Sequence, residues 1–265
     1  MTAPPKNIGA FFDLDGTLLP APSLEWRFIS YLLERDEITT AQIARWLAHF
    51  ATAILRNPHQ ATDANKHYLA GIKASRANDW AHALAPAATH EDSLPLFAPA
   101  LARIKWHHAQ GHHIFLITGT LAPLAKIVAQ QISRRIQAPI EVQATELEIK
   151  PQVWHSHSWL CSDAQWTGRR ASQHMSHKTK SRTLKALAAT NNLDLTQSYA
   201  YGNTTADVPM LESVAHPQAV NPTNRLTRIA HHHRWPILHW QEAPAAELAA
   251  APNRATTQFA TKASQ

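Results

Sequence analysis

The segment FFDLDGT, at positions 11–17, constrains the fold of this chain more than any other. It forms the end of a short apolar run, residues 8–12, that is followed at once by two aspartates and then by Gly-Thr. An apolar run of this length is typical of a strand buried on both faces of a parallel sheet. Carboxylates directly after such a strand lie at the carboxyl edge of the sheet, where α/β proteins carry their ligand sites.

Strand and helix patterns alternate after Pro95, and this alternation predicts an α/β protein with a parallel sheet. Residues 149–175 are polar and rich in Trp and His, which indicates a hairpin with a long loop. The predicted strands are 113–120, 139–149, 198–203, 216–221 and 235–240. The predicted helices are 96–110, 121–136, 177–192, 206–214 and 224–234.

Residues 22–94 differ from the rest because they read as successive helices with few strand signals. Ile43 and Leu47, four positions apart, begin one apolar helical face in this region. We therefore expect a helical insert at 22–94 within a core made of 1–21 and 95–241. Residues 242–265 are rich in Ala, Pro, Thr and Gln without periodicity, and we expect them to form a disordered tail.

The formal net charge of +6, with the His residues neutral, is compatible with nucleic acid, an anionic membrane or a phosphorylated substrate as a partner. Lys and Arg are spread along the chain, so nucleic acid is not expected. No apolar run approaches the ~20 residues of a membrane-spanning helix, and the first residues do not resemble a signal peptide. We expect a cytoplasmic protein without stable membrane insertion, while the sequence leaves the oligomeric state open.

The first candidate site residues are Asp13 and Asp15, on either side of Leu14. Alternation along an extended chain places both carboxylates on one face. Two close carboxylates repel each other, so they either bind a cation or separate into a base and an acid. A hard cation such as Mg²⁺ prefers oxygen ligands and commonly takes one or two carboxylates together with a substrate phosphate.

Polar residues also lie at the end of the second predicted strand and before a later helix. Thr118 and Gly119 offer a hydroxyl and a free N–H group, which suit an anion or equally an ordinary helix cap. Either Lys178 or Lys180 can place an ammonium against a phosphoryl group, although a lysine taken alone is usually a surface residue. These residues favour a phosphate site at the same sheet edge.

Asn203 and Asp207 lie four positions apart after the predicted strand at 198–203. They offer an amide oxygen and a carboxylate at a strand–helix turn. The same residue types serve in ordinary turns and caps, so both uses stay open.

The motifs FFDLDGTLL, ITGT, HKTK and YGNTTADVPML, in this order, resemble those of the haloacid dehalogenase-like superfamily of phosphatases. The insert between the first two motifs resembles the phosphoserine phosphatase branch, subfamily IB. The resemblance covers residues 8–240 approximately. It implies an α/β fold with a Rossmann-like, three-layer parallel-sheet core and a helical cap after the first strand. It also implies a Mg²⁺-dependent phosphomonoesterase that acts on a small phosphorylated metabolite.

The resemblance assigns roles to the aspartates. Asp13 would be the nucleophile that forms an aspartyl-phosphate, and Asp15 the acid that protonates the leaving oxygen and then activates water. Mg²⁺ would bind Asp13, the backbone carbonyl of Asp15 and a residue of the last motif, Asn203 or Asp207.

The remaining roles concern the phosphoryl group. Thr118 and the Gly119 amide would hold its oxygens, and a lysine would neutralise the developing charge. Lys180 fits the family spacing better than Lys178, because it lies four residues before Leu184.

The chain departs from the family at two positions. Asn203 stands where the family usually has a metal-binding Asp, so the site has one negative charge fewer and Asp207 is expected to carry more of the metal binding. Pro22 stands where phosphoserine phosphatases have the cap Glu that reads the substrate ammonium. Glu25, three residues on, is interpreted as a first-turn helix residue. A phosphoserine substrate is therefore not expected.

Two alternative functions stay open from the sequence. A phosphotransferase would use the same aspartyl-phosphate with an alcohol acceptor in place of water. The second alternative is a non-catalytic module that binds a phosphorylated ligand or a partner. In such a module, the replacement of the usual metal-binding Asp by Asn203 would be explained.

Overall fold

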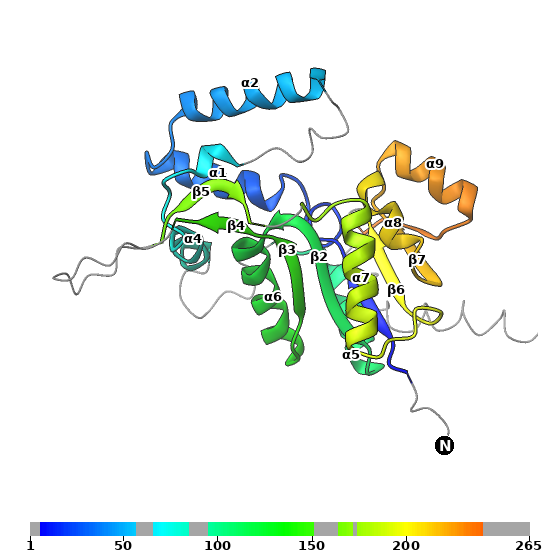
Figure 1. The fold of residues 1–265 in the computed structure, drawn as a ribbon. Helices are drawn as coiled ribbons and strands as arrows, with labels where there is room; N and C mark the ends of the chain where they lie inside the picture. The colour runs from blue at the N-terminus through cyan, green and yellow to red at the C-terminus, as the bar shows by residue number, and fades with distance from the viewer. Residues whose placement is uncertain (1–5, 57–65, 85–94, 151–163, 172–173, 241–265) are drawn as a thin grey trace, which may run out of the picture.

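The computed structural model describes residues 6–56, 66–84, 95–150, 164–171 and 174–240 (Figure 1). The predicted disordered tail at 242–265 and the centre of the predicted long loop lie outside the described residues. The rest of the chain shows the expected alternation of strands and helices.

Among the described residues, six strands form one parallel sheet in the order β3-β2-β1-β6-β7-β8. The central strand β1 pairs with β2 on one side and β6 on the other, and Phe12 is in register with both Leu116 and Tyr201. The carboxyl ends of these three strands therefore meet at one place, which brings the predicted motifs together. The strands are β1 (Gly9–Phe12), β2 (His113–Leu121), β3 (Glu141–Thr145), β6 (Tyr199–Gly202), β7 (His216–Val220) and β8 (Ile237–Leu238).

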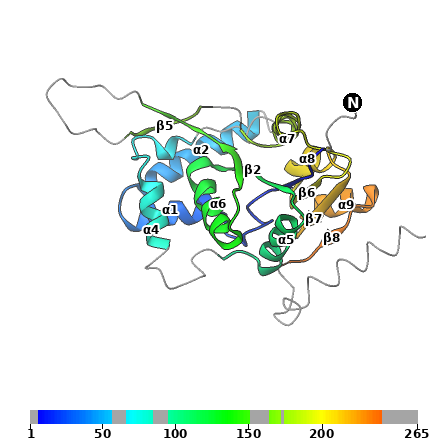
Figure 2. The same cartoon turned by 90° about the horizontal axis from the view of Figure 1, so that it is seen from below.

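Helices cover both faces of this sheet, and Figure 2 shows α5 on one side of the strands and α7 on the other. The three-layer α/β fold class is confirmed. The described helices after residue 95 are α5 (Ala98–Ala109), α6 (Ala122–Ile136), α7 (Lys178–Thr190), α8 (Val208–Leu211) and α9 (Asn224–His233).

The alternation of β1 side chains divides the core into two clusters. Phe12 stacks on Tyr201 with ring centroids 4.4 Å apart and belongs to the cluster under α5 and α6. Phe11 points to the other face, stacks on Phe115 at 5.0 Å and packs with Leu184 of α7. Burial of β1 on both faces fixes the position of the residues that follow it.

The described parts of residues 22–94, between β1 and α5, contain helices. Figure 1 shows α1 and α2 at the top of the molecule, at the opposite end from the N-terminus. None of the described helices is long and apolar enough to cross a membrane. The helical elements of this segment are α1 (Leu24–Glu34), α2 (Thr40–Arg56), η1 (His67–Leu69) and α4 (Arg76–Leu84).

The predicted strand at 139–149 is divided between two sheets. Its first part is β3, whereas β4 (Leu147–Ile149) pairs antiparallel with β5 (Trp166–Arg170). The β5 strand also binds the insert, because the Trp166 N–H donates to the Ile72 carbonyl at 3.0 Å and the Gly71 N–H donates to the Trp166 carbonyl at 2.9 Å. The insert is thus connected to the core by the chain at its two ends and is also hydrogen-bonded to the β4–β5 ribbon.

The predicted helix at 206–214 is shorter than expected. It comprises a 3₁₀ turn, η2 (Thr205–Asp207), followed by the single turn of α8. The Thr204 side chain and the Asp207 carboxylate cap each other's backbone, which fixes this turn directly after β6.

His107 of α5 is completely buried against the sheet. Its Nε2 lies 2.8 Å from the Tyr201 hydroxyl, and its Nδ1 lies 2.8 Å from Nδ1 of His112. Burial lowers the pKa of His107 to about 2, and the neighbouring His112 acts in the same direction. The folded protein therefore keeps this imidazole neutral, while the unfolded chain protonates it near its usual pKa.

We predict that His107 makes the protein sensitive to mild acid. Because the folded pKa is depressed, the stabilisation is complete above the unfolded pKa of about 6.5 and is lost as the pH falls below it. Between pH 7.5 and 5.5 the wild type should lose about 1.4 kcal/mol more unfolding free energy than His107→Gln. Urea denaturation at both pH values measures this, with exposed His108→Gln as the control. Equal losses in the wild type and His107→Gln would contradict the prediction.

Candidate active site

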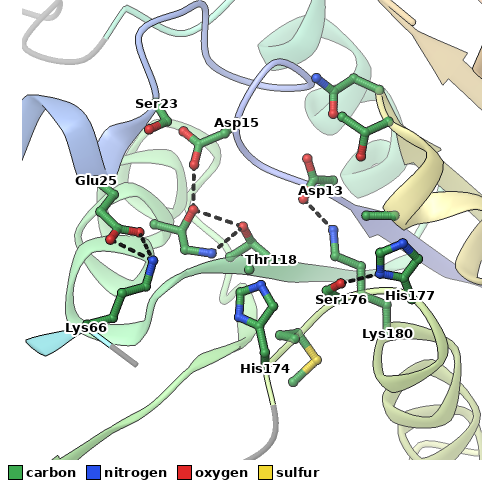
Figure 3. A pocket seen from close by; sticks show the side chains of 16 residues that line it. Asp13, Asp15, Ser23, Glu25, Lys66, Thr118, His174, Ser176, His177 and Lys180 are labelled. Atoms are coloured by element: carbon green, nitrogen blue, oxygen red, sulfur yellow. Dashed lines mark hydrogen bonds and ion pairs between the residues drawn. The ribbon is translucent and has the colours of Figure 1, made fainter. Parts of the chain in front are cut away.

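A pocket of about 340 Å³ lies at the carboxyl edge of the sheet (Figure 3). The ends of β1, β2 and β6, the insert and the segment before α7 all contribute to it. Six of the residues predicted from the sequence line it: Asp13, Asp15, Thr118, Gly119, Lys180 and Asn203. The other lining residues are Ser23, Glu25, Lys66, Thr120, His174, Met175, Ser176, His177, Thr204 and Ala206.

Asp13 directly follows β1 and lies at the base of the pocket. Its N–H donates to the Tyr201 carbonyl at 2.9 Å, which continues the pairing with β6 beyond the strand. Its Oδ2 accepts a long hydrogen bond of 3.3 Å from the Thr17 hydroxyl. Burial raises the pKa of Asp13 to about 7, although the positive charge of Lys180 acts to lower it.

Lys180, in the first turn of α7, joins two carboxylates. Its Nζ lies 2.6 Å from Oδ1 of Asp13 and 2.5 Å from Oδ1 of Asp207. Burial alone would lower the pKa of Lys180, but the charges of the two carboxylates raise it above its usual value. Lys178, one half-turn earlier, is exposed and does not line the pocket. The ammonium beside Asp13 is therefore that of Lys180.

Asp15 has different surroundings from Asp13. Its Oδ1 accepts from the N–H of Leu24 at 2.7 Å, and its Oδ2 accepts from the Thr120 hydroxyl at 2.6 Å. Burial raises its pKa, and hydrogen bonds from Thr120 and Leu24 oppose this rise. The contact with Leu24 ties this carboxylate to the first residue of α1.

Thr118 and Gly119 form the wall at the end of β2. The buried Thr118 hydroxyl donates to the Thr120 hydroxyl at 3.1 Å, and the Gly119 carbonyl accepts from the Thr145 hydroxyl at 2.8 Å. A Cβ at Gly119 would lie 3.3 Å from Cε1 of His174, so the imidazole covers this glycine closely. The wall is therefore held from β3 and from the segment before α7.

Asn203 lines the same pocket as Asp13, and its backbone is held on both sides. Its N–H donates to Oδ2 of Asp207 at 3.1 Å, and its carbonyl accepts from the Thr223 N–H at 2.9 Å. Its side chain packs against Gly16, where a Cβ would lie only 1.9 Å from the Asn203 Nδ2. Gly16 has φ +81°, so both its conformation and its close contact require glycine.

Asp207 is buried and does not line the pocket. Its Oδ1 binds Lys180, while its Oδ2 accepts from the N–H groups of Asn203 and Thr204 and from the Thr204 hydroxyl. Both oxygens are thus engaged in holding neighbouring groups. This geometry does not present Asp207 to a ligand in the pocket.

The donor set of the pocket fits a hard divalent cation. Asp13 and Asp15 line the pocket, whereas Asp207 lies outside its lining. Lys180 contacts Asp13 and Asp207, and the Lys66 ammonium is paired with Glu25. The ionised forms of Asp13, Asp15 and Asp207 therefore leave two negative charges uncompensated. Asn203 adds a neutral oxygen at the same edge. No group of three or more His, Cys, Asp or Glu side chains with metal-binding geometry occurs among the described residues. A cation here would therefore need main-chain, amide or substrate oxygens as well.

Several residues that line the pocket are not predicted from the sequence. Glu25 is in the first turn of α1, as interpreted, but it also lines the pocket beside Lys66 of the insert. His174 and His177 line the pocket from the segment before α7. No local pattern identifies these residues, since Lys66 and the histidines reach the pocket only through tertiary packing.

Comparison with known proteins gives a family for this chain. The sequence profile of the haloacid dehalogenase-like hydrolases matches residues 10–212. An "inhibition of morphological differentiation protein" of Streptomyces azureus is 26% identical over 231 residues, which are 86% of this chain and 77% of that protein. A protein of Mycobacterium tuberculosis named as a probable phosphatase is 26% identical over 242 residues, with 89% and 77% covered.

Solved structures share the fold at low sequence identity. A protein of unknown function from Bordetella pertussis superposes with a TM-score of 0.66 and 24% identity, covering 89% of this chain and 100% of that one. A substrate-bound phosphoserine phosphatase gives a TM-score of 0.55 and 13% identity, covering 89% and 94%. These likenesses concern the fold.

We predict that Gly16→Ala is destabilising because it displaces Asn203. A Cβ adds strain at φ +81° and also collides with the Asn203 amide. We expect a loss of about 2–4 kcal/mol of unfolding free energy in urea denaturation. Gly111→Ala is the matched control, because Gly111 has φ +74° with no atom within 4 Å of the added Cβ. Equal losses in the two variants would show that the contact with Asn203 contributes nothing.

Proposed function

The chain belongs to the haloacid dehalogenase-like hydrolase family, and on that premise we propose that it is a Mg²⁺-dependent phosphomonoesterase that hydrolyses a small phosphorylated metabolite through an aspartyl-phosphate. The naming of the Mycobacterium tuberculosis relative as a probable phosphatase supports this proposal. The residue roles below belong to the same proposal.

One observation carries the proposal: two carboxylates two positions apart have different environments. Asp13 is held against the ammonium of Lys180, whereas Asp15 is held by a hydroxyl and a main-chain N–H. Pairs of titratable groups with different surroundings are typical of an acid and a base or nucleophile that act together. Burial raises the pKa of both carboxyl groups, so the assignment rests on their partners. The Lys180 ammonium beside Asp13 favours its carboxylate form, whereas Asp15 is held by neutral donors, and we therefore assign the proton-carrying role to Asp15.

In the first step, an Asp13 carboxylate oxygen attacks the phosphorus of the ester. A bond forms between this oxygen and phosphorus while the bond from phosphorus to the alcohol oxygen breaks. Asp15 gives its proton to the departing oxygen, which leaves as the neutral alcohol. The products of this step are an aspartyl-phosphate at Asp13 and an ionised Asp15.

In the second step, the ionised Asp15 takes a proton from water, and the water oxygen attacks the phosphorus. The bond between phosphorus and Asp13 breaks, which releases inorganic phosphate and restores both carboxyl groups to their starting forms. Hydrogen bonds from Leu24 and Thr120 hold Asp15 in one orientation for both proton transfers.

We assign three groups to the binding of the transferred phosphoryl oxygens. The Thr118 hydroxyl and the Gly119 N–H lie at the end of β2, and the Lys180 ammonium lies beside Asp13. Donors fixed in a buried site stabilise negative charge with little reorganisation during the reaction. Asp207 acts indirectly, because it positions Lys180 and the Asn203 backbone.

Mg²⁺ would be held by Asp13, the main-chain carbonyl of Asp15 and the amide oxygen of Asn203. When bound, the ion would offset the negative charges of the pocket and of the substrate phosphate. Asn203 is the distinctive member of this set because it brings no charge. Asp207 is placed outside it, since its oxygens are engaged by Lys180 and by the turn after β6.

We also propose that residues 22–94 form a cap over a core of 1–21 and 95–241. Ser23, Glu25 and Lys66 of this segment line the pocket, so the segment is placed to contact the leaving group. Contact through Leu24 would make the position of Asp15 depend on the cap.

We predict that Asp13→Asn abolishes hydrolysis of p-nitrophenyl phosphate in the presence of Mg²⁺. The amide oxygen is a poor nucleophile, and loss of a covalent nucleophile lowers kcat by on the order of 10⁴–10⁶. Steady-state assays measure this loss, with the exposed Asp36→Asn as a control that should stay active. A wild type that binds phosphate without any turnover would instead favour the binding-module alternative.

We predict that the effect of Asp15→Asn depends on the leaving group. For alkyl phosphates, which need a proton on the departing oxygen, kcat should fall by about 10²–10⁴. The fall should be smaller for p-nitrophenyl phosphate, whose leaving group is stable as an anion. Comparison of kcat for both esters measures the difference, and identical losses would argue against the acid role.

We predict that Asn203→Asp tightens Mg²⁺ binding. The side chains are nearly isosteric, and hard cations gain affinity with the number of charged ligands. Calorimetric titration of Mg²⁺ without substrate should show a lower Kd, independently of activity. The exposed Asn78→Asp on α4, which adds the same charge elsewhere, is the control. An unchanged or weaker affinity in Asn203→Asp would remove Asn203 from the ligand set.

A further inference from the structure

An ion pair that the proposed chemistry does not use lies in the same pocket. The Lys66 Nζ is 2.8 Å from Oε1 and 3.0 Å from Oε2 of Glu25, and each side chain is 15% exposed. Figure 3 shows the pair on the Asp15 side of the pocket, away from Lys180. The charge of Glu25 also contributes to the raised pKa of Asp15, so the pair lies near the proposed acid.

The position of Asp15 determines which part of a substrate meets this pair. The acid must lie beside the oxygen that leaves, so the alcohol portion of the ester lies on the Asp15 side. The phosphoryl group lies on the other side, at Asp13 and Lys180. Glu25 and Lys66 are therefore placed to contact the alcohol portion.

Aromatic residues of the insert hold the pair in place. The Tyr68 hydroxyl donates to Glu25, and Tyr68 is almost completely buried. Burial and the charge of Glu25 raise the Tyr68 pKa well above its usual value, so the phenol stays a donor. The Trp46 ring lies 4.9 Å from the Tyr68 ring and 5.8 Å from the Lys66 Nζ. The pair is thus organised before a ligand arrives.

The compensated charge of the pair decides what it can recognise. A substrate ammonium would approach Glu25 but would be repelled by Lys66, and a substrate carboxylate would meet the reverse arrangement. A hydroxyl can accept a hydrogen bond from Lys66 and donate one to Glu25 without disturbing the balance. The lysine ammonium has three N–H donors, so one can point to a ligand while two face the Glu25 oxygens.

We propose that Glu25 and Lys66 are specificity-determining residues that select a phosphate ester of a neutral alcohol with at least one further hydroxyl, such as a polyol or sugar phosphate. This inference rests on the proposed function, because it assigns a substrate class to the same pocket. The pocket volume of about 340 Å³ is suited to a small ester of this kind.

The test compares esters that differ only in one terminal group. The phosphate esters of two- and three-carbon alcohols are prepared with a terminal methyl, hydroxyl, ammonium or carboxylate group, and kcat/KM is measured with Mg²⁺. For the wild type, the hydroxyl ester should exceed the methyl ester by about three- to tenfold, in keeping with added neutral hydrogen bonds. The ammonium and carboxylate esters should not exceed the methyl ester.

Two variants should change this preference in opposite directions. Lys66→Met leaves the Glu25 charge uncompensated, so the ammonium ester should gain on the hydroxyl ester by on the order of tenfold. Glu25→Gln leaves the Lys66 charge, so the carboxylate ester should gain by a similar factor. A purely structural role would lower kcat/KM for all esters alike. The two variants give separate tests. If one of them has a folding defect, seen as a lowered Tm, the other still tests the inference.

A matched ion pair of the insert serves as the control. Arg76 Nε lies 2.7 Å from Glu37, and neither residue lines the pocket, so Glu37→Gln should keep the wild-type preference. A wild type that hydrolyses p-nitrophenyl phosphate but prefers the ammonium or carboxylate ester would overturn this inference alone. So would two variants with an unchanged preference. A wild type that hydrolyses p-nitrophenyl phosphate but none of the alkyl esters would likewise overturn this inference alone, whereas a wild type that hydrolyses neither would overturn the proposed function as well.

Discussion

The ammonium of Lys180 lies between the carboxylates of Asp13 and Asp207, and the geometry of the pocket depends on this buried contact. It joins three elements that are distant in sequence: the end of β1, the first turn of α7 and the turn after β6. Removal of the ammonium would leave two buried carboxylates facing each other without compensation, which is strongly unfavourable. The same contact positions Asn203, because Asp207 uses its other oxygen to hold the Asn203 N–H.

Two aspartates of the same segment acquire different properties from their surroundings. Asp13 faces an ammonium at the base of the pocket, whereas Asp15 faces Thr120 and the first N–H of α1. The second contact connects the proposed acid to the insert, and the insert also contributes the Glu25–Lys66 pair. Under the proposed function, the alcohol portion of a substrate and the group that protonates its oxygen would therefore both depend on the same part of the chain.

The sequence predicts the core of this arrangement because its residues lie at or directly after the carboxyl ends of parallel strands. Once β1, β2 and β6 are recognised, Asp13, Thr118 and Asn203 must meet at one edge of the sheet. Which of Lys178 and Lys180 faces Asp13 depends on the residue at which α7 begins. The His177 N–H, directly before α7, donates to the Ala206 carbonyl, and this tertiary contact is not visible in the sequence.

The pairing of Glu25 with Lys66 could not be predicted, because it spans 41 positions and forms through the fold of the insert. The attachment of β5 to residues 71–74 is a tertiary contact of the same kind. Local patterns specify helices and strands, but they carry no information about which surfaces of an insert meet the core.

The most direct measurement is chemical trapping of the covalent intermediate on the native protein. Borohydride reduces an aspartyl-phosphate to homoserine, which peptide mass spectrometry identifies by position. After quenching during turnover of p-nitrophenyl phosphate with Mg²⁺, homoserine should appear at position 13 and only when substrate is present. Homoserine at another position, or none at position 13 while turnover continues, would contradict the proposal that Asp13 is the nucleophile.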